Sequence, residues 1–385
     1  MSYGLLAGVL IHGAVVTLTL VSPRRPFWLA GLSYRLAAAY NEVPVLLALV
    51  LLALTLPGVL DPATEPTGRA VALALTTLVV AGFVVIAWRG AQARPVVARA
   101  LEADLGPRSD LRLDAEQRTV LERRPPLGHL LVPFVLRPRD VERVTAVPYG
   151  PAGRAHRLDL YRHRSRPSGA PVLVHLHGGG YHSGRRSLES RALLFRLARL
   201  GWVTVAADYR LRPHAGFLDH LADVKRILAW VREHGPEYGA DAGTVVLAGG
   251  SAGAHLSSIA ALTQNDPQYQ PGFEDADTSV SAVVGLYGWY GGYYEHGGPR
   301  SEAGPLGHDA SDAPPFFIAH GTRDSLAHVE TARRFVAHLR GASSEPVVYA
   351  ELPGGQHAFD LFHSLRFSAV VDGVEAFATR VHARV

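Results

Sequence analysis

A serine flanked by glycines gives the strongest chemical signal in the chain. Residues 249–253 read Gly-Gly-Ser-Ala-Gly, directly after the apolar run Thr244–Ala248 and at the start of a helical pattern. A Gly-x-Ser-x-Gly motif at a strand–turn–helix junction is a nucleophile elbow, in which small neighbours permit a tight turn that exposes the serine hydroxyl. The pattern predicts Ser251 as a nucleophile. The alternative is an ordinary glycine-rich turn that happens to carry a serine.

A second glycine-rich segment suits the charge that such a nucleophile creates. Residues 177–181 read His-Gly-Gly-Gly-Tyr and follow the apolar strand pattern Val172–Leu176. Attack by serine produces a tetrahedral oxyanion, which backbone N–H groups stabilise when no Cβ atoms block their approach. The expected donors are the N–H groups of Gly179, Gly180 and Ala252. A phosphate-binding turn is the alternative, but the Lys-Ser/Thr pair that it requires does not follow.

A serine also needs a histidine to take its proton and a carboxylate to orient that histidine. The chain has 19 histidines, so position must decide. In α/β folds whose serine lies on a nucleophile elbow, the acid and then the histidine follow the serine along the chain, each after a strand. Asp324 follows the strand pattern Phe316–His320, and His357 follows Val347–Glu351. We expect these two residues to complete a triad.

Together these motifs resemble the hormone-sensitive-lipase-like carboxylesterases over residues 143–385. The segments that carry the resemblance are HGGGY, GGSAG, the DYRL of residues 208–211, the HGTRD that ends at Asp324 and the GGQH that ends at His357. The resemblance implies ester hydrolysis through an acyl-enzyme, with no metal and no organic cofactor. Gly250 departs from the pattern because that family commonly has aspartate there, which puts the subfamily in doubt.

Two other functions fit part of the same evidence. An acyltransferase would use the same triad with an alcohol in place of water, and the sequence does not separate the two reactions. A non-catalytic binding or receptor protein of this fold is a further alternative, although all three triad positions are filled. Prolyl-oligopeptidase-like peptidases usually have tyrosine after the serine, where this chain has Ala252.

Short apolar strands that alternate with helical patterns position these motifs from residue 143 onward. This alternation predicts a mostly parallel, eight-stranded sheet covered on both faces, the α/β-hydrolase fold. The expected strands are Arg143–Val147, Arg157–Tyr161, Val172–His177, Trp202–Ala207, Thr244–Ala248, Val280–Leu286, Phe316–His320 and Val347–Glu351. The expected helices are Leu188–Leu200, Phe217–Val231, Ala252–Leu262, Val329–Leu339 and Ser364–Val381.

Three apolar stretches precede this pattern, at Leu5–Val21, Val43–Leu60 and Ala70–Trp88. Each is roughly 17 to 19 residues long, near the minimum for a membrane-spanning helix. We therefore expect about three transmembrane helices within residues 1–90, a linker over 91–142 and a catalytic domain over 143–385. The lipid bilayer is then a partner of the protein. Buried core helices are the alternative, and the first stretch has no basic segment or cleavage site typical of a signal peptide.

Arginines around these stretches predict the orientation. Arg24, Arg25 and Arg35 lie between the first two stretches, and Arg89, Arg94 and Arg99 follow the third, whereas only Arg69 lies between the second and third. Basic residues in short flanking segments are retained on the cytoplasmic side. We expect an integral membrane protein whose catalytic domain is cytoplasmic.

The remaining composition excludes several classes of function. The chain has no cysteine, which excludes a cysteine nucleophile, disulfides and thiolate metal sites. Its net charge is +4, but the basic residues are scattered and do not alternate with aromatic residues, so nucleic-acid binding is not expected.

An aromatic segment predicts the type of substrate. Residues 286–294 hold five aromatic side chains among glycines after an expected strand, so they can form one wall of an apolar acyl pocket. Tyr181, Trp289 and Tyr290 are the expected substrate-binding residues. Residues 127–136 are apolar but too short to span a bilayer, and they are expected to lie on its surface or to complete the lid. Lipid-like or other apolar esters are the expected substrates.

Overall fold

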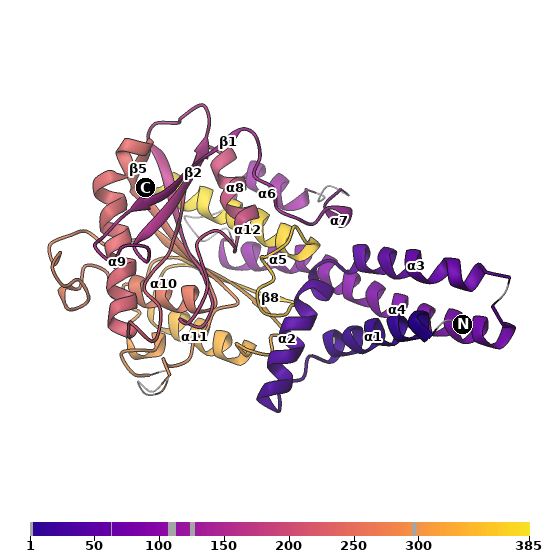
Figure 1. Ribbon diagram of the computed structural model, residues 1–385. Coiled ribbons are helices and arrows are strands. Elements are labelled where there is room, and N and C mark those ends of the chain that lie inside the picture. The colour runs from indigo at the N-terminus through magenta and orange to yellow at the C-terminus, as the bar shows by residue number, and fades with distance from the viewer. Residues whose placement is uncertain (1–2, 63, 107–112, 124–127, 295–297, 299) are drawn as a thin grey trace.

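The computed structural model describes residues 3–62, 64–106, 113–123, 128–294, 298 and 300–385, arranged as a group of N-terminal helices beside an α/β domain (Figure 1). The α/β domain contains one sheet of eight strands in the order β1-β2-β4-β3-β5-β6-β7-β8. The pairs β1–β2 and β2–β4 are antiparallel, and the remaining neighbours are parallel. The predicted eight-stranded, mostly parallel sheet is therefore confirmed. The strands are β1 Val141–Pro148, β2 Arg157–His163, β3 Ala170–Leu176, β4 Val203–Ala207, β5 Ala240–Gly250, β6 Ala282–Leu286, β7 Phe316–Gly321 and β8 Val347–Leu352.

The central strands are apolar on both faces because helices cover both sides of the sheet. In β3, Val172 and Val174 pack into one hydrophobic core, whereas Leu173 packs into the core on the opposite face. The first core contains residues of α9 Phe217–His234, α10 Ala252–Leu262 and α11 Val329–Ala342. The second contains residues of α8 Arg191–Arg199 and α12 Leu365–Arg384. Short 3-10 helices occur at Gly235–Tyr238, Pro267–Tyr269 and Pro305–Gly307.

The described part of the segment interpreted from the sequence as a linker contains three helices. These are α5 Ala93–Asp104, α6 Ala115–Glu122 and α7 Gly128–Leu131. Ala93, Val97 and Leu101 of α5 are fully buried in the second core, on the same face of the sheet as α12. Helix α5 is thus structurally part of the α/β domain.

Three helices, α1 Tyr3–Val21, α3 Pro44–Leu60 and α4 Pro66–Ala91, lie side by side and project away from the α/β domain (Figure 1). We call these three helices the N-terminal bundle. Its inner contacts are made by residues such as Val16, Leu51 and Phe83, which form a small core of their own. Its outer faces are apolar as well, since Leu54, Leu78 and Val84 are 65%, 69% and 60% exposed.

Among the described residues, one helix is long and apolar enough to cross a membrane, Pro66–Asp104, in which α4 continues into α5. A second candidate consists of two helices, Trp28–Glu42 and Pro44–Leu60, bent by 88° at their junction. The helix at the first stretch, Leu6–Val21, is apolar but shorter. The three predicted spans therefore stay a prediction.

Helix α2, Phe27–Glu42, was not expected from the sequence, which we interpreted as a loop between two spans. It runs across the base of the N-terminal bundle, next to the α/β domain (Figure 1). Ala30, Ser33 and Ala37 on one side of it are fully buried. Packing against α1, α3 and α4, together with single contacts to the α/β domain such as that between Ala30 and Ser325, stabilises this segment as a helix without a long apolar run.

Candidate active site

The turn between β5 and α10 holds Ser251 in a strained backbone conformation. Its φ and ψ angles are 51° and −115°, a region that residues other than glycine rarely occupy. A Cβ at Gly249 would lie 2.3 Å from the carbonyl carbon of Gly253, and a Cβ at Gly253 would lie 2.1 Å from the Leu176 oxygen. Both positions therefore require glycine. The predicted elbow has the geometry that exposes a serine hydroxyl.

The structure brings together the three side chains that the sequence singled out as a triad. Asp324 lies in the loop after β7 and His357 in the loop after β8, at the same sheet edge as Ser251. His357 Nε2 is 2.9 Å from Ser251 Oγ, and His357 Nδ1 is 2.8 Å from Asp324 Oδ2. Both distances are those of hydrogen bonds, so the three groups form one continuous chain.

Asp324 is held rigidly and in its charged form. Its Oδ1 accepts hydrogen bonds from the N–H groups of Leu326 at 2.9 Å and Ala327 at 2.8 Å. Burial raises the pKa of Asp324, but His357, His320 and these donors outweigh burial, so that its pKa lies below the usual value. An ionised Asp324 keeps the proton of His357 on Nδ1, which leaves Nε2 free to accept the serine proton.

The second glycine-rich segment lies against the nucleophile. A Cβ at Gly178 would be only 3.0 Å from the Cβ of Ser251. Gly179 and Gly180 have φ angles of 108° and 59°, and their backbone N–H groups donate no hydrogen bond to any residue that the structure describes. Ala252 begins α10, so its N–H is one of the donors without an intrahelical acceptor. Gly178 and Ala252 thus lie next to Ser251, and the role of the Gly179, Gly180 and Ala252 N–H groups in binding the oxyanion stays a prediction.

Comparison with known proteins identifies the family. The family model described as BD-FAE matches residues 158–291. The probable carboxylic ester hydrolase LipM of Mycobacterium tuberculosis is 38% identical over 419 residues, an alignment covering 98% of this chain and 94% of that protein. The chain belongs to the LipM-like esterases. Esterase LipQ of the same organism is 37% identical, covering 67% of each chain. These relatives confirm the predicted enzyme class, a carboxylic ester hydrolase.

Solved structures agree with this LipM-like assignment at the level of the fold. A truncated carbohydrate esterase from gut microbiota superposes with a TM-score of 0.55 at 19% identity, over 62% of this chain and 96% of that chain. The apo form of esterase 2 of Thermogutta terrifontis superposes with a TM-score of 0.54 at 24% identity, over 63% and 94%. Both place the LipM-like chain in the α/β-hydrolase fold.

The aromatic residues expected to bind substrate occupy different positions in this LipM-like esterase. Tyr290 is 1% exposed and stacks on Phe335, with ring centroids 4.7 Å apart, so it is a core residue and not a pocket wall. Tyr181 is also buried, and its hydroxyl is 2.7 Å from His255 Nδ1. Trp289 is half-buried, and its backbone N–H donates to the backbone oxygen of Ser251 at 3.2 Å, so it stays a candidate.

Tyr294 belongs to the aromatic segment predicted to form a pocket wall, but it was not among the residues singled out to bind substrate. It is 50% exposed, and its hydroxyl donates a hydrogen bond to the Gly180 oxygen. The guanidinium of Arg212 lies 4.1 Å from the centre of its ring. An exposed aromatic side chain bonded to the glycine loop is better placed to meet a substrate than the buried Tyr290.

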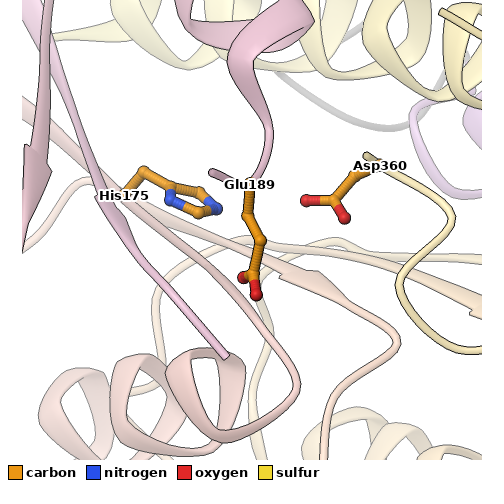
Figure 2. Close-up of side chains that lie close together, drawn as sticks. All are labelled: His175, Glu189 and Asp360. Atoms are coloured by element: carbon orange, nitrogen blue, oxygen red, sulfur yellow. The ribbon is translucent and has the colours of Figure 1, made fainter. Parts of the chain in front are cut away.

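Next to the glycine loop lies a cluster that the sequence did not reveal, formed by the buried His175 of β3, the buried Asp360 and the partly buried Glu189 (Figure 2). Glu189 Oε2 accepts the N–H of Gly178 at 2.6 Å. Burial, followed by the charge of Asp360, raises the pKa of Glu189 to about 8. Burial lowers the pKa of His175 to about 3. The cluster therefore carries less charge than its residue types suggest.

Ligand atoms of this cluster lie within 4.8 Å of one another, a spacing that a metal ion could bridge. Both oxygens of Asp360 already accept short hydrogen bonds, from Tyr287 and Ser190 at 2.6 Å each. One oxygen of Glu189 is bonded to Gly178. Because these bonds use the carboxylates, we interpret the cluster as a support that fixes the glycine loop beside Ser251.

Proposed function

We propose that this esterase is anchored in a membrane and hydrolyses esters with apolar acyl or alcohol groups through Ser251, His357 and Asp324. The observation that carries the proposal is the hydrogen-bonded chain from Ser251 Oγ through His357 to Asp324, at 2.9 Å and 2.8 Å. Within the α/β-hydrolases, the HGGGY and GGSAG motifs support placement beside the hormone-sensitive-lipase-like enzymes. Gly250, where those enzymes commonly have aspartate, speaks against a typical member.

The geometry supports a two-step reaction. His357 Nε2 takes the proton of Ser251 as its Oγ bonds to the acyl carbon, and Asp324 stabilises the imidazolium that forms. The N–H groups of Gly179, Gly180 and Ala252 donate hydrogen bonds to the carbonyl oxygen and stabilise the negative charge that develops on it. The C–O bond then breaks, and His357 gives the proton to the leaving alcohol. A water molecule then bonds to the acyl carbon as His357 takes its proton, the bond between the acyl carbon and Ser251 Oγ breaks, and His357 returns the proton to Ser251 as the acid leaves.

The N-terminal bundle supports the membrane anchor. Its outward residues Leu54, Leu78 and Val84 are apolar and at least 60% exposed, which is unusual for a surface in water. Helix α4 has 26 residues and is therefore about 39 Å long, enough for a hydrocarbon layer of about 30 Å. Bilayer lipid would cover these side chains.

Labelling by a fluorophosphonate probe tests the nucleophile. We expect the full-length protein in detergent to react with the probe and to hydrolyse p-nitrophenyl butyrate. Ser251→Ala should abolish labelling and lower turnover by about 10³-fold or more, because the nucleophile is lost while the fold remains. Ser258→Ala is the matched control, since Ser258 is buried in α10, the helix that follows Ser251, and its hydroxyl donates to the Ala254 oxygen. Retained labelling of Ser251→Ala would overturn the assignment.

A further inference from the structure

Helix α2 contacts the catalytic residues directly. The ring of Tyr34 meets the ring of His357 edge-on, with centroids 5.6 Å apart and planes at 81°. The carbonyl oxygen of Ala30, one turn earlier, accepts a hydrogen bond from Ser325 Oγ at 3.2 Å. Because Ser325 follows Asp324, one helix touches both the histidine and the acid loop.

Neighbouring residues of the N-terminal region strengthen this contact. Arg323, which precedes Asp324, donates to the carbonyl oxygen of Val21 at 3.1 Å. Glu42, the last residue of α2, forms an ion pair with Arg366, and both side chains are almost fully buried. Asp324 is therefore flanked on both sides by residues bonded to the N-terminal region, and breaking these contacts would disturb the triad.

The opposite side of α2 is exposed and apolar. Trp28, Leu32 and Leu36 are 68%, 41% and 40% exposed, and their spacing of four residues places them in one stripe. Arg25 and Arg35 are exposed nearby. An apolar stripe with adjacent arginines is typical of a helix that lies in the interface of a membrane containing anionic lipid.

The direction of α2 fits that location. It is bent by 88° from α3, and it crosses the base of the N-terminal bundle (Figure 1). If the bundle axis follows the membrane normal, a helix at right angles to it lies in the membrane plane. The bundle then fixes α2 at the depth where hydrocarbon meets head groups.

We propose that α2 is an interfacial helix with two functional faces: Trp28, Leu32 and Leu36 lie in lipid, and Tyr34 positions His357. The catalytic centre then lies at the bilayer surface, and its substrate is the ester of a membrane-resident amphiphile. This inference rests on the proposed function, because it requires the membrane anchor and the triad.

Spin labels test the outer face of α2, the exposed apolar stripe. Single cysteines can be labelled specifically because the native chain contains no cysteine. Leu32→Cys and Leu36→Cys are labelled with a nitroxide in the full-length protein, reconstituted in vesicles of phosphatidylcholine and phosphatidylglycerol. Leu218→Cys, on α9 and 55% exposed, is the control. We expect collisions with oxygen to exceed those with a water-soluble nickel chelate on α2, and the reverse at position 218.

Two results would overturn the lipid contact. Nickel accessibility on α2 equal to that at position 218 would show that this face is in water. Low accessibility to both reagents would show that a protein, such as a second copy of the chain, covers it. Fluorophosphonate labelling of every variant is measured in parallel, so that loss of the proposed function is distinguishable from either result.

Turnover of embedded substrate tests the substrate class. Leu36→Asp should lower hydrolysis of p-nitrophenyl palmitate held in vesicles more than hydrolysis of soluble p-nitrophenyl butyrate, because a charged α2 leaves the lipid. Leu218→Asp should not change the ratio of the two rates. Equal losses on both substrates in Leu36→Asp would contradict delivery from the bilayer.

Substitutions of Tyr34 test the inner face of α2, the side that contacts His357. Tyr34→Ala should lower kcat for p-nitrophenyl butyrate by up to roughly tenfold with little change in KM, because an edge-on ring contact is worth a modest free energy. Tyr34→Phe keeps the ring and should restore kcat. A kcat of Tyr34→Ala equal to that of the wild type, or a loss that phenylalanine does not rescue, would contradict positioning by the ring.

Discussion

Buried carboxyl groups serve two different purposes around Ser251. Asp324 is surrounded by His357, His320 and backbone donors that hold its pKa below the usual value, so it carries the charge that an imidazolium needs. Glu189 is buried beside Asp360 instead, and its pKa is raised to about 8. Asp324 is therefore ionised and orients His357, whereas Glu189 keeps a proton and accepts the hydrogen bond of Gly178. Local partners, and not residue type, decide between these states.

The hydrogen-bonded chain predicts how triad variants combine. His357→Ala should reduce ester turnover nearly as much as Ser251→Ala, and the double variant should be little worse, because the members act as a unit. Asp324→Asn should be less damaging but still severe, since an amide leaves the imidazole in the wrong tautomer. Steady-state kinetics with p-nitrophenyl butyrate measure all four proteins. Additive losses in the double variant would contradict a common proton pathway.

The buried proton on Glu189 predicts a pH-dependent stability. The folded pKa is raised from 4.5 to about 8, so the folded protein keeps a proton that the unfolded chain has released over this range. Stability from this group is present below about pH 4.5 and is lost as the pH rises to about 8. The Tm of the wild type should therefore fall relative to that of Glu189→Gln between these pH values. Scanning fluorimetry in detergent measures Tm as a function of pH, and Glu233→Gln, at an exposed glutamate, is the control. Parallel curves of Tm against pH for the wild type and Glu189→Gln would contradict a proton bound to Glu189 in the folded protein.

At the scale of elements, the sheet was predictable because buried parallel strands are continuous apolar runs. β7 begins at Phe316 and β8 at Val347, as expected, and α10 has the expected bounds, Ala252–Leu262. The catalytic edge follows from those strand ends. Helix α2 was not predictable, because Arg35 and Asn41 interrupt its apolar pattern and because its partners in the α/β domain lie hundreds of residues away. Contacts between distant residues also explain why the Glu189–Asp360 cluster gave no signal.

The position of α5 predicts where the α/β domain can be cut. A fragment starting at residue 140 loses Ala93, Val97 and Leu101 from the core. Burial of a Val or Leu side chain contributes about 1.5–3 kcal/mol, and a domain is stable by only about 5–15 kcal/mol. We expect this fragment to be insoluble or to melt without cooperativity, whereas a fragment starting at residue 92 should be folded. Circular dichroism melting compares them. An equally cooperative transition in the shorter fragment would show that α5 is dispensable.

At the scale of the whole molecule, two of the arginines from which the cytoplasmic side was predicted bond to the α/β domain. Arg24 pairs with Glu330 of α11 at 3.1 Å, and Arg94 pairs with Asp372 of α12 at 2.8 Å. Arg69 instead bonds to the Asp61 oxygen at 3.0 Å, in the turn between α3 and α4 at the far end. Arg24 and Arg94 therefore lie at the domain end and Arg69 at the opposite end, as the sequence predicts. This grouping supports a common side for the arginine-rich segments and the domain.

This arrangement predicts a cytoplasmic catalytic domain. Arginines in short segments beside a span resist translocation, so the segments that carry Arg24, Arg25, Arg35, Arg89, Arg94 and Arg99 should remain inside. Alkaline phosphatase fused after Val385 should be inactive, and a cytoplasmic reporter at the same position should be active. The same phosphatase inserted in the α3–α4 turn is the control and should be active, because that turn is at the opposite end. If the phosphatase were active at the C-terminus and inactive in the α3–α4 turn, the catalytic domain would lie outside the cytoplasm. The arginines would then bind the α/β domain without determining the orientation.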